Sequence, residues 1–157
     1  MRAAAALMPR SILPLLPLLY PAAAAPSPLE SCLDAASVPY DVPDTEAWDL
    51  DVAPFNTRLP YLPAAIAVPR TTAHIEDAVK CEVEHDVKVS PKSGGHSYAS
   101  LGLGGEDGHL VVELDRMSEV RLEDGTAFVQ GGARLGHVAV ELYEQGDRAI
   151  AHGTCPG

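Results

Sequence analysis

A glycine-rich segment combines several groups that can bind an anion. It follows an expected strand at residues 87–90 and reads Pro91, Lys92, Ser93, Gly94, Gly95, His96, Ser97, Tyr98. Adjacent glycines let successive backbone N–H groups turn toward one anion and form a small nest, while the serine hydroxyls add donors and Lys92 adds positive charge. His96 would then lie within reach of a ring system attached to a bound diphosphate. An exposed Ser/Gly turn with an inactive histidine fits the same residues, so both interpretations stay open at this point.

Cys155 is the second candidate for chemistry. It lies in a Gly/Pro-rich run with His152, Gly153 and Thr154, a setting that suits a reactive sulfur. The other two cysteines are Cys32 and Cys81, and in an oxidising compartment three cysteines make one disulfide and leave one thiol over. A bridge to Cys81, near the end of an expected helix, would pin an N-terminal arm to the domain. The residues themselves allow all three pairings, and His152 fits either tuning of the Cys155 thiol or a structural role.

A second glycine-rich segment, residues 131–136, competes as a phosphate site. Its sequence Gly-Gly-Ala-Arg-Leu-Gly imitates the dinucleotide-binding pattern G-x-G-x-x-G, but Ala133 occupies the second glycine position. That position must be small enough for the backbone to approach a pyrophosphate, and no acidic residue follows at about 20 positions to bind a ribose. The segment is better interpreted as a tight turn into a helix.

The remaining histidines do not predict a metal site. His74 and His85 do not share adjacent turns of one helical face, and the chain contains neither H-E-x-x-H nor a pair of C-x-x-C motifs. We interpret His109 and His137 as solvated or locally hydrogen-bonded, and expect no metal.

The charge of the chain narrows the class of partner. A net charge of -11 over 157 residues opposes binding to a nucleic-acid backbone or to an anionic membrane surface. A hydrophobic content of 46% is enough for an ordinary core. An acidic protein that binds a small molecule is expected.

Residues 1–25 have the composition of a secretory signal peptide. Arg2 and Arg10 precede or flank an apolar run at residues 12–20, and Ala23, Ala24 and Ala25 offer a small-residue cleavage site. The run is shorter than the roughly 20 residues of a membrane span. We expect a signal peptide over 1–25, an N-terminal arm over 26–60 and one domain over 61–157; a disordered Ala/Pro tail is the alternative for the first segment.

The elements that must position these residues are short and alternate in type. Residues 26–58 are expected to be mostly coil, because prolines interrupt them. A helix starting at Thr71 or Thr72 and ending near Glu84 would bury Ile75, Ala78, Val79 and Val83 on one face. A second helical face comprises Leu135, Val138, Ala139, Leu142 and Tyr143. Strands are expected at 64–68, 87–90, 110–114 and 149–151, with a hairpin formed by 120–122 and 127–130 and a long loop over 91–109. The fold class is α+β, or mixed α/β.

Several of these motifs together resemble one enzyme family. Residues 92–98 look like the flavin pyrophosphate loop of the berberine-bridge-enzyme-like FAD oxidases, within the vanillyl-alcohol-oxidase superfamily, and residues 152–157 resemble that family's second flavin-attachment loop. Residues 110–114 and 129–135 match its strand–hairpin–helix pattern. Residues 55–61 and the Cys32/Cys81 pair are similar more particularly to fungal gluco-oligosaccharide oxidases. The resemblance covers about residues 30–157.

The resemblance implies a partial PCMH-type FAD-binding domain without its substrate domain. FAD would be attached twice, through the His96 ring nitrogen to the flavin 8α-methyl carbon and through the Cys155 sulfur to ring position C6. Other implied cofactor contacts come from Lys92, Ser93, Gly94, Gly95, Ser97, Tyr98, Gly153 and Thr154. The resemblance also implies a Cys32–Cys81 disulfide.

The implied activity is that of a secreted, monomeric carbohydrate oxidase. It would convert an oligosaccharide's anomeric hydroxyl to a lactone and reduce O2 to hydrogen peroxide, with no nucleic acid or membrane as partner. The family's catalytic base lies beyond the matching region, so no residue of this chain is assigned that role and the chain alone is expected to be incomplete and inactive. The alternatives are an oxidase of alkaloids or other secondary metabolites, and an inert flavin-binding remnant.

Overall fold

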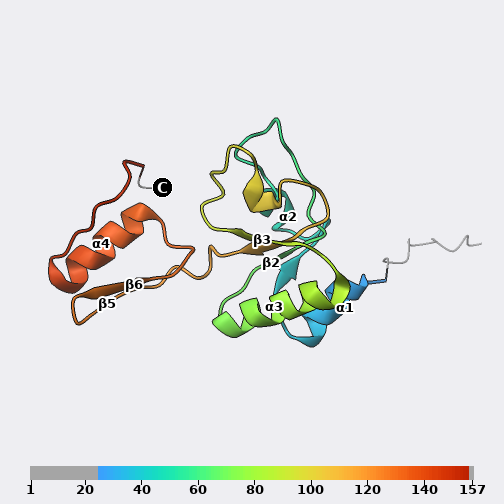
Figure 1. Ribbon diagram of the computed structural model, residues 1–157, viewed down its shortest axis with the longest axis horizontal. Helices are drawn as coiled ribbons and strands as arrows, with labels where there is room; N and C mark the ends of the chain where they lie inside the picture. The colour runs from blue at the N-terminus through green and yellow to red at the C-terminus, as the bar shows by residue number, and fades with distance from the viewer. Residues whose placement is uncertain (1–24, 156–157) are drawn as a thin grey trace, which may run out of the picture.

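The computed structural model describes residues 25–155, so the expected signal peptide lies almost wholly outside the described residues. The described chain forms two neighbouring parts (Figure 1). We call residues 28–113 the sheet part and residues 120–146 the hairpin part. Within residues 25–155, none of the helices has the length and apolar character needed to cross a membrane.

The sheet part is built on four strands. In spatial order they are β1 (Tyr40–Asp41), β2 (Ala65–Ala67), β4 (Leu110–Glu113) and β3 (Val89–Lys92). The last three run parallel, and β1 pairs antiparallel with β2. Because helices cover both faces of such a sheet, its central strands are apolar without alternation, as the fully buried run Leu110, Val111 and Val112 shows. The mixed helix-and-sheet class expected from the sequence is confirmed.

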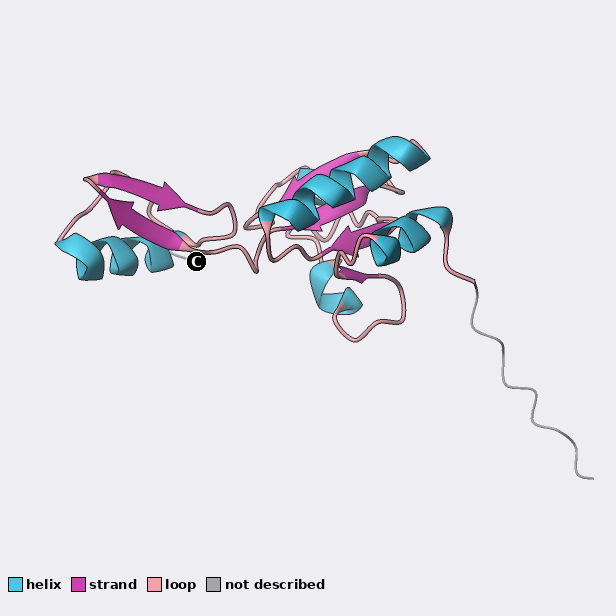
Figure 2. Ribbon diagram, turned by 90° about the horizontal axis from the view of Figure 1, so that it is seen from below, coloured by secondary structure: helices cyan, strands magenta, loops and turns pink. Residues whose placement is uncertain are grey.

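Helices lie on both faces of this sheet (Figure 2). Ala65, Ala67 and Leu110 point to one face, where they meet α1 (Pro28–Ala35) and α3 (Thr72–His85). On the opposite face, Ile66 and Val111 pack with residues of α2 (Trp48–Asp51) and the 3-10 helix η1 (Leu101–Leu103).

Helix α3 begins where the sequence predicted, but its buried face differs from the expected one. Thr71 caps it, its side chain accepting a hydrogen bond from the His74 backbone N–H at 3.2 Å. Ala78 and Cys81 are its buried residues, whereas Val79 and Val83 are exposed. The expected apolar face was therefore wrong in part, because the contact with α1 turns Cys81 toward the core.

The expectation of coil over residues 26–58 was also wrong in part. Ser27 accepts a hydrogen bond from the Glu30 N–H at 3.2 Å and caps α1, whose first residue is Pro28. Proline is well tolerated at that first helical position, since its missing N–H has no partner there anyway. Leu29 and Leu33 then fix the helix onto the sheet.

The hairpin part contains β5 (Val120–Glu123), β6 (Thr126–Val129) and α4 (Leu135–Gly146). The hairpin is confirmed, and its turn residues Asp124 and Gly125 both have positive φ, at 49° and 77°. Helix α4 buries Val138 and Leu142 against Val120, while Ala139 and Tyr143, expected on the same face, are exposed. The expected strand at 149–151 is not formed: these residues are exposed and pair with no strand among the described residues.

Candidate functional site

The glycine-rich segment starts where β3 ends at Lys92. Gly95 has a φ of +71°, a left-handed conformation that glycine adopts without steric cost. The segment turns there and leaves His96 exposed at its surface. Gly95 thus has the left-handed conformation that one residue of a nest requires.

His96 is held by an aromatic neighbour from the N-terminal arm. The rings of Phe55 and His96 meet edge to face, with centroids 5.4 Å apart, and Phe55 makes a similar contact with Tyr98 at 5.5 Å. Asn56 Nδ2 donates to the Tyr98 carbonyl oxygen at 2.7 Å, which ties the same arm to the loop. The arm therefore contacts the imidazole directly and is also bonded to the loop that carries it.

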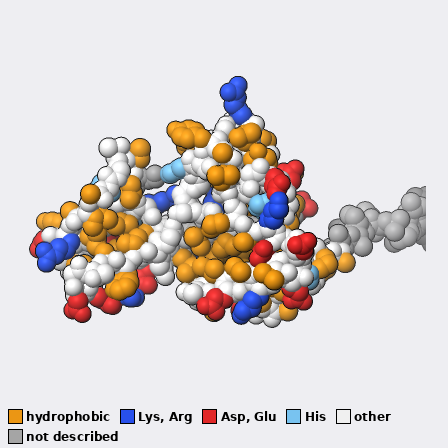
Figure 3. Space-filling view, in the orientation of Figure 1, with side chains coloured by type: hydrophobic (Ala, Val, Ile, Leu, Met, Phe, Trp, Pro, Cys, Tyr) orange, Lys and Arg blue, Asp and Glu red, His pale blue; other side chains and the backbone are white. Residues whose placement is uncertain are grey.

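Cys155 shares a pocket with His96, although the two residues belong to different parts of the chain. The pocket has a volume of about 360 Å³, and its other lining residues are Ser93, Gly94, Ala133, Arg134, Leu135, Gly153 and Thr154. Cys155 is an exposed free thiol. A space-filling view shows histidine and Lys/Arg side chains at the hollow between the two parts (Figure 3). An imidazole, a thiol and a guanidinium thus surround one opening.

The two glycine-rich segments that competed as phosphate sites line this same pocket. Gly132 lies so close to the end of β4 that a Cβ would overlap the Leu114 carbonyl group. The distance from this Cβ to the Leu114 carbonyl carbon would be only 2.6 Å. Ser93 Oγ donates to the Gly131 carbonyl oxygen and joins the segments directly. Residues 131–134 form a turn that leads into α4, as interpreted from the sequence, and the turn also forms a pocket wall.

Arg134 is a pocket residue that the sequence analysis did not select. Its Nη1 lies 2.7 Å from the position of a Cβ on Gly94, over the glycine loop. The available signal was its place directly before an expected helix, in a segment already weighed as an anion site. Arg134 gives the pocket a cation beside both His96 and Cys155.

Lys92 takes a different position from the one its charge suggested. Its ammonium forms an ion pair with Glu113 and donates to the Asp51 carbonyl oxygen at 2.8 Å. Burial raises the pKa of Glu113 above its ordinary value, against the lowering effect of Lys92. The structure therefore places the Lys92 ammonium beneath the loop.

The loop hydroxyls and His152 have local hydrogen bonds. Ser97 Oγ accepts from the Leu101 backbone N–H at 3.2 Å, which leaves its own proton for another acceptor. His152 Nδ1 lies 2.5 Å from the Gly153 carbonyl oxygen and must therefore carry a proton to donate there. Tyr98 is 80% exposed, with its side chain at the protein surface.

The family of the chain follows from a comparison with known protein families. A model described as an FAD binding domain matches residues 63–155, more than half of the chain and the whole of this pocket. The chain belongs to the FAD-binding domain family. Within this FAD-binding domain, the imidazole, the thiol and the cation around one opening are a donor set that fits a flavin.

Fungal oligosaccharide oxidases are similar to this FAD-binding domain throughout the described region. A chitooligosaccharide oxidase of Gibberella zeae is 60% identical over 130 residues, which cover 82% of this chain and 26% of the relative. A xylooligosaccharide oxidase of Thermothelomyces thermophilus is 61% identical over 131 residues, again 82% of this chain and 26% of the relative. The chain thus spans about a quarter of the length of these relatives.

Solved structures agree with the sequence comparison. The structure of a chitooligosaccharide oxidase matches with a TM-score of 0.80 and 59% identity, over 83% of this chain and 28% of that protein. A glucooligosaccharide oxidase of Acremonium strictum, described as having a 6-S-cysteinyl, 8α-N1-histidyl FAD, matches with a TM-score of 0.80 and 53% identity, over 83% of this chain and 28% of that protein. The fold of this chain is therefore that of the FAD-binding domain in such oxidases.

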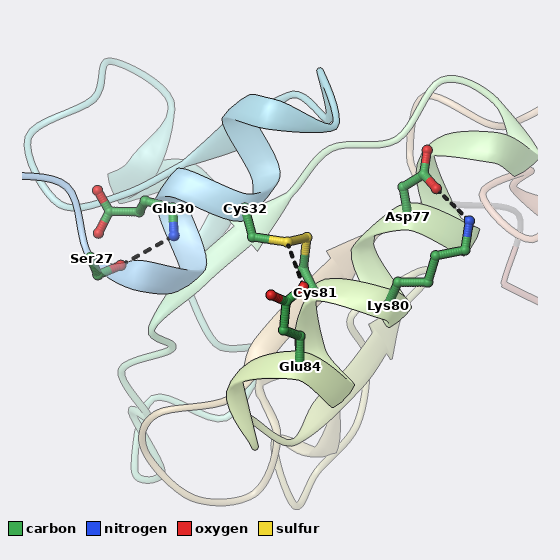
Figure 4. The surroundings of a disulfide bond; sticks show 7 residues. All are labelled: Ser27, Glu30, Cys32, Asp77, Lys80, Cys81 and Glu84. Carbon is green, nitrogen blue, oxygen red and sulfur yellow. Dashed lines mark hydrogen bonds and ion pairs between the residues drawn. A yellow bond between two sulfur atoms is a disulfide. The ribbon is translucent and has the colours of Figure 1, made fainter.

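A disulfide between Cys32 and Cys81 joins α1 to α3, with a Cα–Cα distance of 5.8 Å (Figure 4). It confirms the pairing implied by the resemblance. Cys32, Glu84 and His85 also cluster closely enough to suggest a metal site, but a disulfide sulfur has no thiolate to offer a metal. Because the Cys32 sulfur carries no proton, its 4.0 Å distance to Glu84 Oε2 is a van der Waals contact and not a hydrogen bond.

Proposed function

We propose that this chain is the FAD-binding part of a secreted oxidase in which His96 and Cys155 both bond covalently to the flavin. The observation that carries this proposal is the convergence of the imidazole and the free thiol on one pocket. His96 supplies a ring nitrogen, and Cys155 supplies a sulfur that reacts as thiolate. Each attachment replaces an N–H or S–H and a carbon–hydrogen bond, so two electrons and two protons leave, with O2 as their final acceptor.

The other cofactor contacts are proposed for the loop around this pair. Ser93, Gly94, Gly95, Ser97 and Tyr98 belong to the glycine loop, and Gly153 and Thr154 precede the thiol. Gly95 provides the turn, Ser97 retains a proton to donate, and Arg134 adds the positive charge that an anionic group would meet. Lys92 stays a proposed site residue, with its ammonium bonded to Glu113 and to the Asp51 carbonyl oxygen.

The substrate that we propose is an oligosaccharide with a free reducing end. Relatives named as chitooligosaccharide and xylooligosaccharide oxidases are 60% and 61% identical to this chain. Oxidation of an anomeric hydroxyl to a lactone removes two electrons and two protons from the sugar, and reduction of O2 to hydrogen peroxide consumes both. A flavin bound here would supply the acceptor for the hydride in this exchange. We also propose a signal peptide at residues 1–25, an arm at 26–60, and a monomer outside the cell.

A second candidate is oxidation of a secondary metabolite. An FAD-linked oxidoreductase of Metarhizium anisopliae is 58% identical over 127 residues, so likeness in this domain does not by itself select a sugar. The complete protein that contains this chain should be assayed for peroxide release with chito-, xylo- and gluco-oligosaccharides. Borohydride-reduced forms of the same oligosaccharides are the matched control, because they lack an anomeric hydroxyl. Peroxide from the native sugars alone supports the proposal, and equal release from both forms contradicts it.

A further inference from the structure

A buried ion pair lies next to the glycine loop, where its two residues, Lys92 and Glu113, line a second pocket together with His96. Lys92 and Glu113 are directly opposite each other at the ends of the parallel strands β3 and β4. Their side chains are only 13% and 4% exposed. Removing two charges from water costs several kcal/mol per ion, so such a pair is poor evidence for stability alone. A role in fixing geometry is the better explanation.

The Lys92 ammonium has a second partner from another segment. It donates to the Asp51 carbonyl oxygen at the end of α2, at 2.8 Å. The same side chain therefore connects β3, β4 and the segment that leads to Phe55, whose ring touches His96. Both the loop and the aromatic neighbour of His96 are tied to one ammonium.

The loop is shaped around the aliphatic stem of Lys92. A Cβ on Gly95 would lie 3.1 Å from Lys92 Cε, and a Cβ on Gly102 would lie 3.4 Å from Lys92 Cγ. The backbone at both glycines therefore rests close to the stem, and Gly95 immediately precedes His96. Loss of the stem or of its partners would let the loop sink or shift at that point.

We propose that Lys92 is a positioning residue that holds the glycine loop at the height where His96 faces the pocket shared with Cys155. It acts through the ion pair with Glu113, the hydrogen bond to Asp51 and the packing of its stem under Gly95. This inference rests on the proposed attachment of flavin to His96. This role differs from a direct contact between Lys92 and a phosphate of the cofactor. A phosphate contact would hold the cofactor as a whole, whereas the contacts of Lys92 with Glu113, Asp51 and Gly95 position His96 specifically.

The test compares Lys92→Met, Lys92→Arg and Lys88→Met in the complete protein. Lys88 is the matched control, because it is also paired with a glutamate, Glu106, but at an exposed site. Proteolysis followed by mass spectrometry gives the ratio of flavin on the His96 peptide to flavin on the Cys155 peptide. For Lys92→Met we expect this ratio to fall about tenfold, since misplacing a reacting group by about 1 Å can cost about 10²-fold in rate. Lys92→Arg should restore most of the ratio, and Lys88→Met should leave it unchanged.

A double variant keeps the test decisive if Lys92→Met does not fold. Lys92→Met with Glu113→Leu removes both charges, and replacing a buried pair by apolar residues is often neutral for stability. A folded double variant with a low His96 ratio supports the proposal, and one with a wild-type ratio overturns it. Equal losses of bound flavin from the His96 and Cys155 peptides, with less FAD retained overall, would also overturn the proposal and would favour a direct contact between Lys92 and a phosphate. If the wild-type protein carries no flavin on His96, the proposed function itself fails, and that result is seen before any variant is made.

Discussion

The ring of Phe55 meets the imidazole of His96 edge to face, with centroids 5.4 Å apart and planes inclined by 66°. Phe55 lies outside the residues 63–155 that match the family model. The arm that precedes the domain therefore contributes directly to the candidate site. It does so through Phe55 and through the Asn56 hydrogen bond to Tyr98.

Replacing Phe55 should impair attachment at His96 more than it affects stability. Phe55 is 55% exposed, so Phe55→Ala removes little buried area, but it frees the imidazole to rotate. An aromatic contact of this kind contributes about 0.5–1.5 kcal/mol. We expect a several-fold smaller His96-linked fraction in peptide maps of the complete protein. Leu62→Ala, at a residue that is 62% exposed, is the control and should match wild type. Equal His96 attachment in Phe55→Ala and wild type would exclude the positioning effect.

Removing the disulfide should destabilise the domain. The bridge spans 49 residues between Cys32 and Cys81, and the chain-entropy model gives about 4 kcal/mol for a loop of this length. Cys32→Ser with Cys81→Ser should therefore lower the denaturation midpoint clearly. Cys155→Ser is the control for loss of a cysteine without loss of the bridge. Peptide maps of the denatured, unreduced protein should show Cys32 joined to Cys81; a disulfide that includes Cys155 would contradict the assignment.

Gly132 should tolerate no side chain. A Cβ there would overlap the Leu114 carbonyl and lie 2.9 Å from the Met117 carbonyl oxygen, both backbone groups that cannot move aside cheaply. We expect Gly132→Ala to cost about 3 kcal/mol or more of unfolding free energy. Gly125→Ala is the control, because Gly125 has a φ of +77° but nothing within 4 Å, so it isolates backbone strain of roughly 1 kcal/mol. Similar losses of unfolding free energy in the two variants would show that the close approach of Gly132 to Leu114 does not exclude a side chain.

Two glutamates should affect acid stability in opposite directions. The hydrogen bond from Lys88 lowers the pKa of Glu106 below its ordinary 4.5, and a hydrogen bond with His109 lowers it further. The contribution of Glu106 to folding stability is therefore fully present above pH 4.5 and is lost as the pH falls through the folded-state pKa. Burial raises the pKa of Glu113 above 4.5, so the folded state holds this proton longer and stability falls as the pH rises from 4.5 toward the folded-state pKa.

Melting temperatures measured from pH 3 upward test these signs, because such a series crosses the ordinary glutamate pKa of 4.5. The advantage of wild type over Glu106→Gln should grow with pH, and its advantage over Glu113→Gln should shrink with pH. If the two differences in melting temperature changed with pH in the same direction, the environment of Glu106 or of Glu113 would differ from the one described.

Local signals in the sequence were sufficient for most of the strands and for the beginning of α3. The hairpin followed from Asp124 and Gly125, and the strand β4 from its unbroken apolar run. The helix α1 was missed although Ser27 and Glu30 have the spacing of a capping box, because the prolines of residues 26–58 were taken to favour coil. These features depend on neighbours within a few residues.

The site needed relationships that no local pattern contains. The position of Lys92 depends on its register with Glu113, and the buried face of α3 depends on the bridge from Cys32. Arg134 lines the pocket because the close approach of Gly132 to Leu114 places the turn before α4 next to the end of β4. His96 and Cys155 were selected from the sequence by chemistry and resemblance, whereas their common pocket could be seen only in three dimensions.

The most direct test of the account is a map of covalently bound flavin in the complete protein that contains this chain. The protein is denatured in acid, precipitated and digested, and the peptides that absorb as flavin are sequenced by mass spectrometry. We expect one flavin that joins the His96 peptide to the Cys155 peptide, and single attachments in His96→Ala and Cys155→Ala. A colourless precipitate, with all FAD in solution and both peptides unmodified, would contradict it.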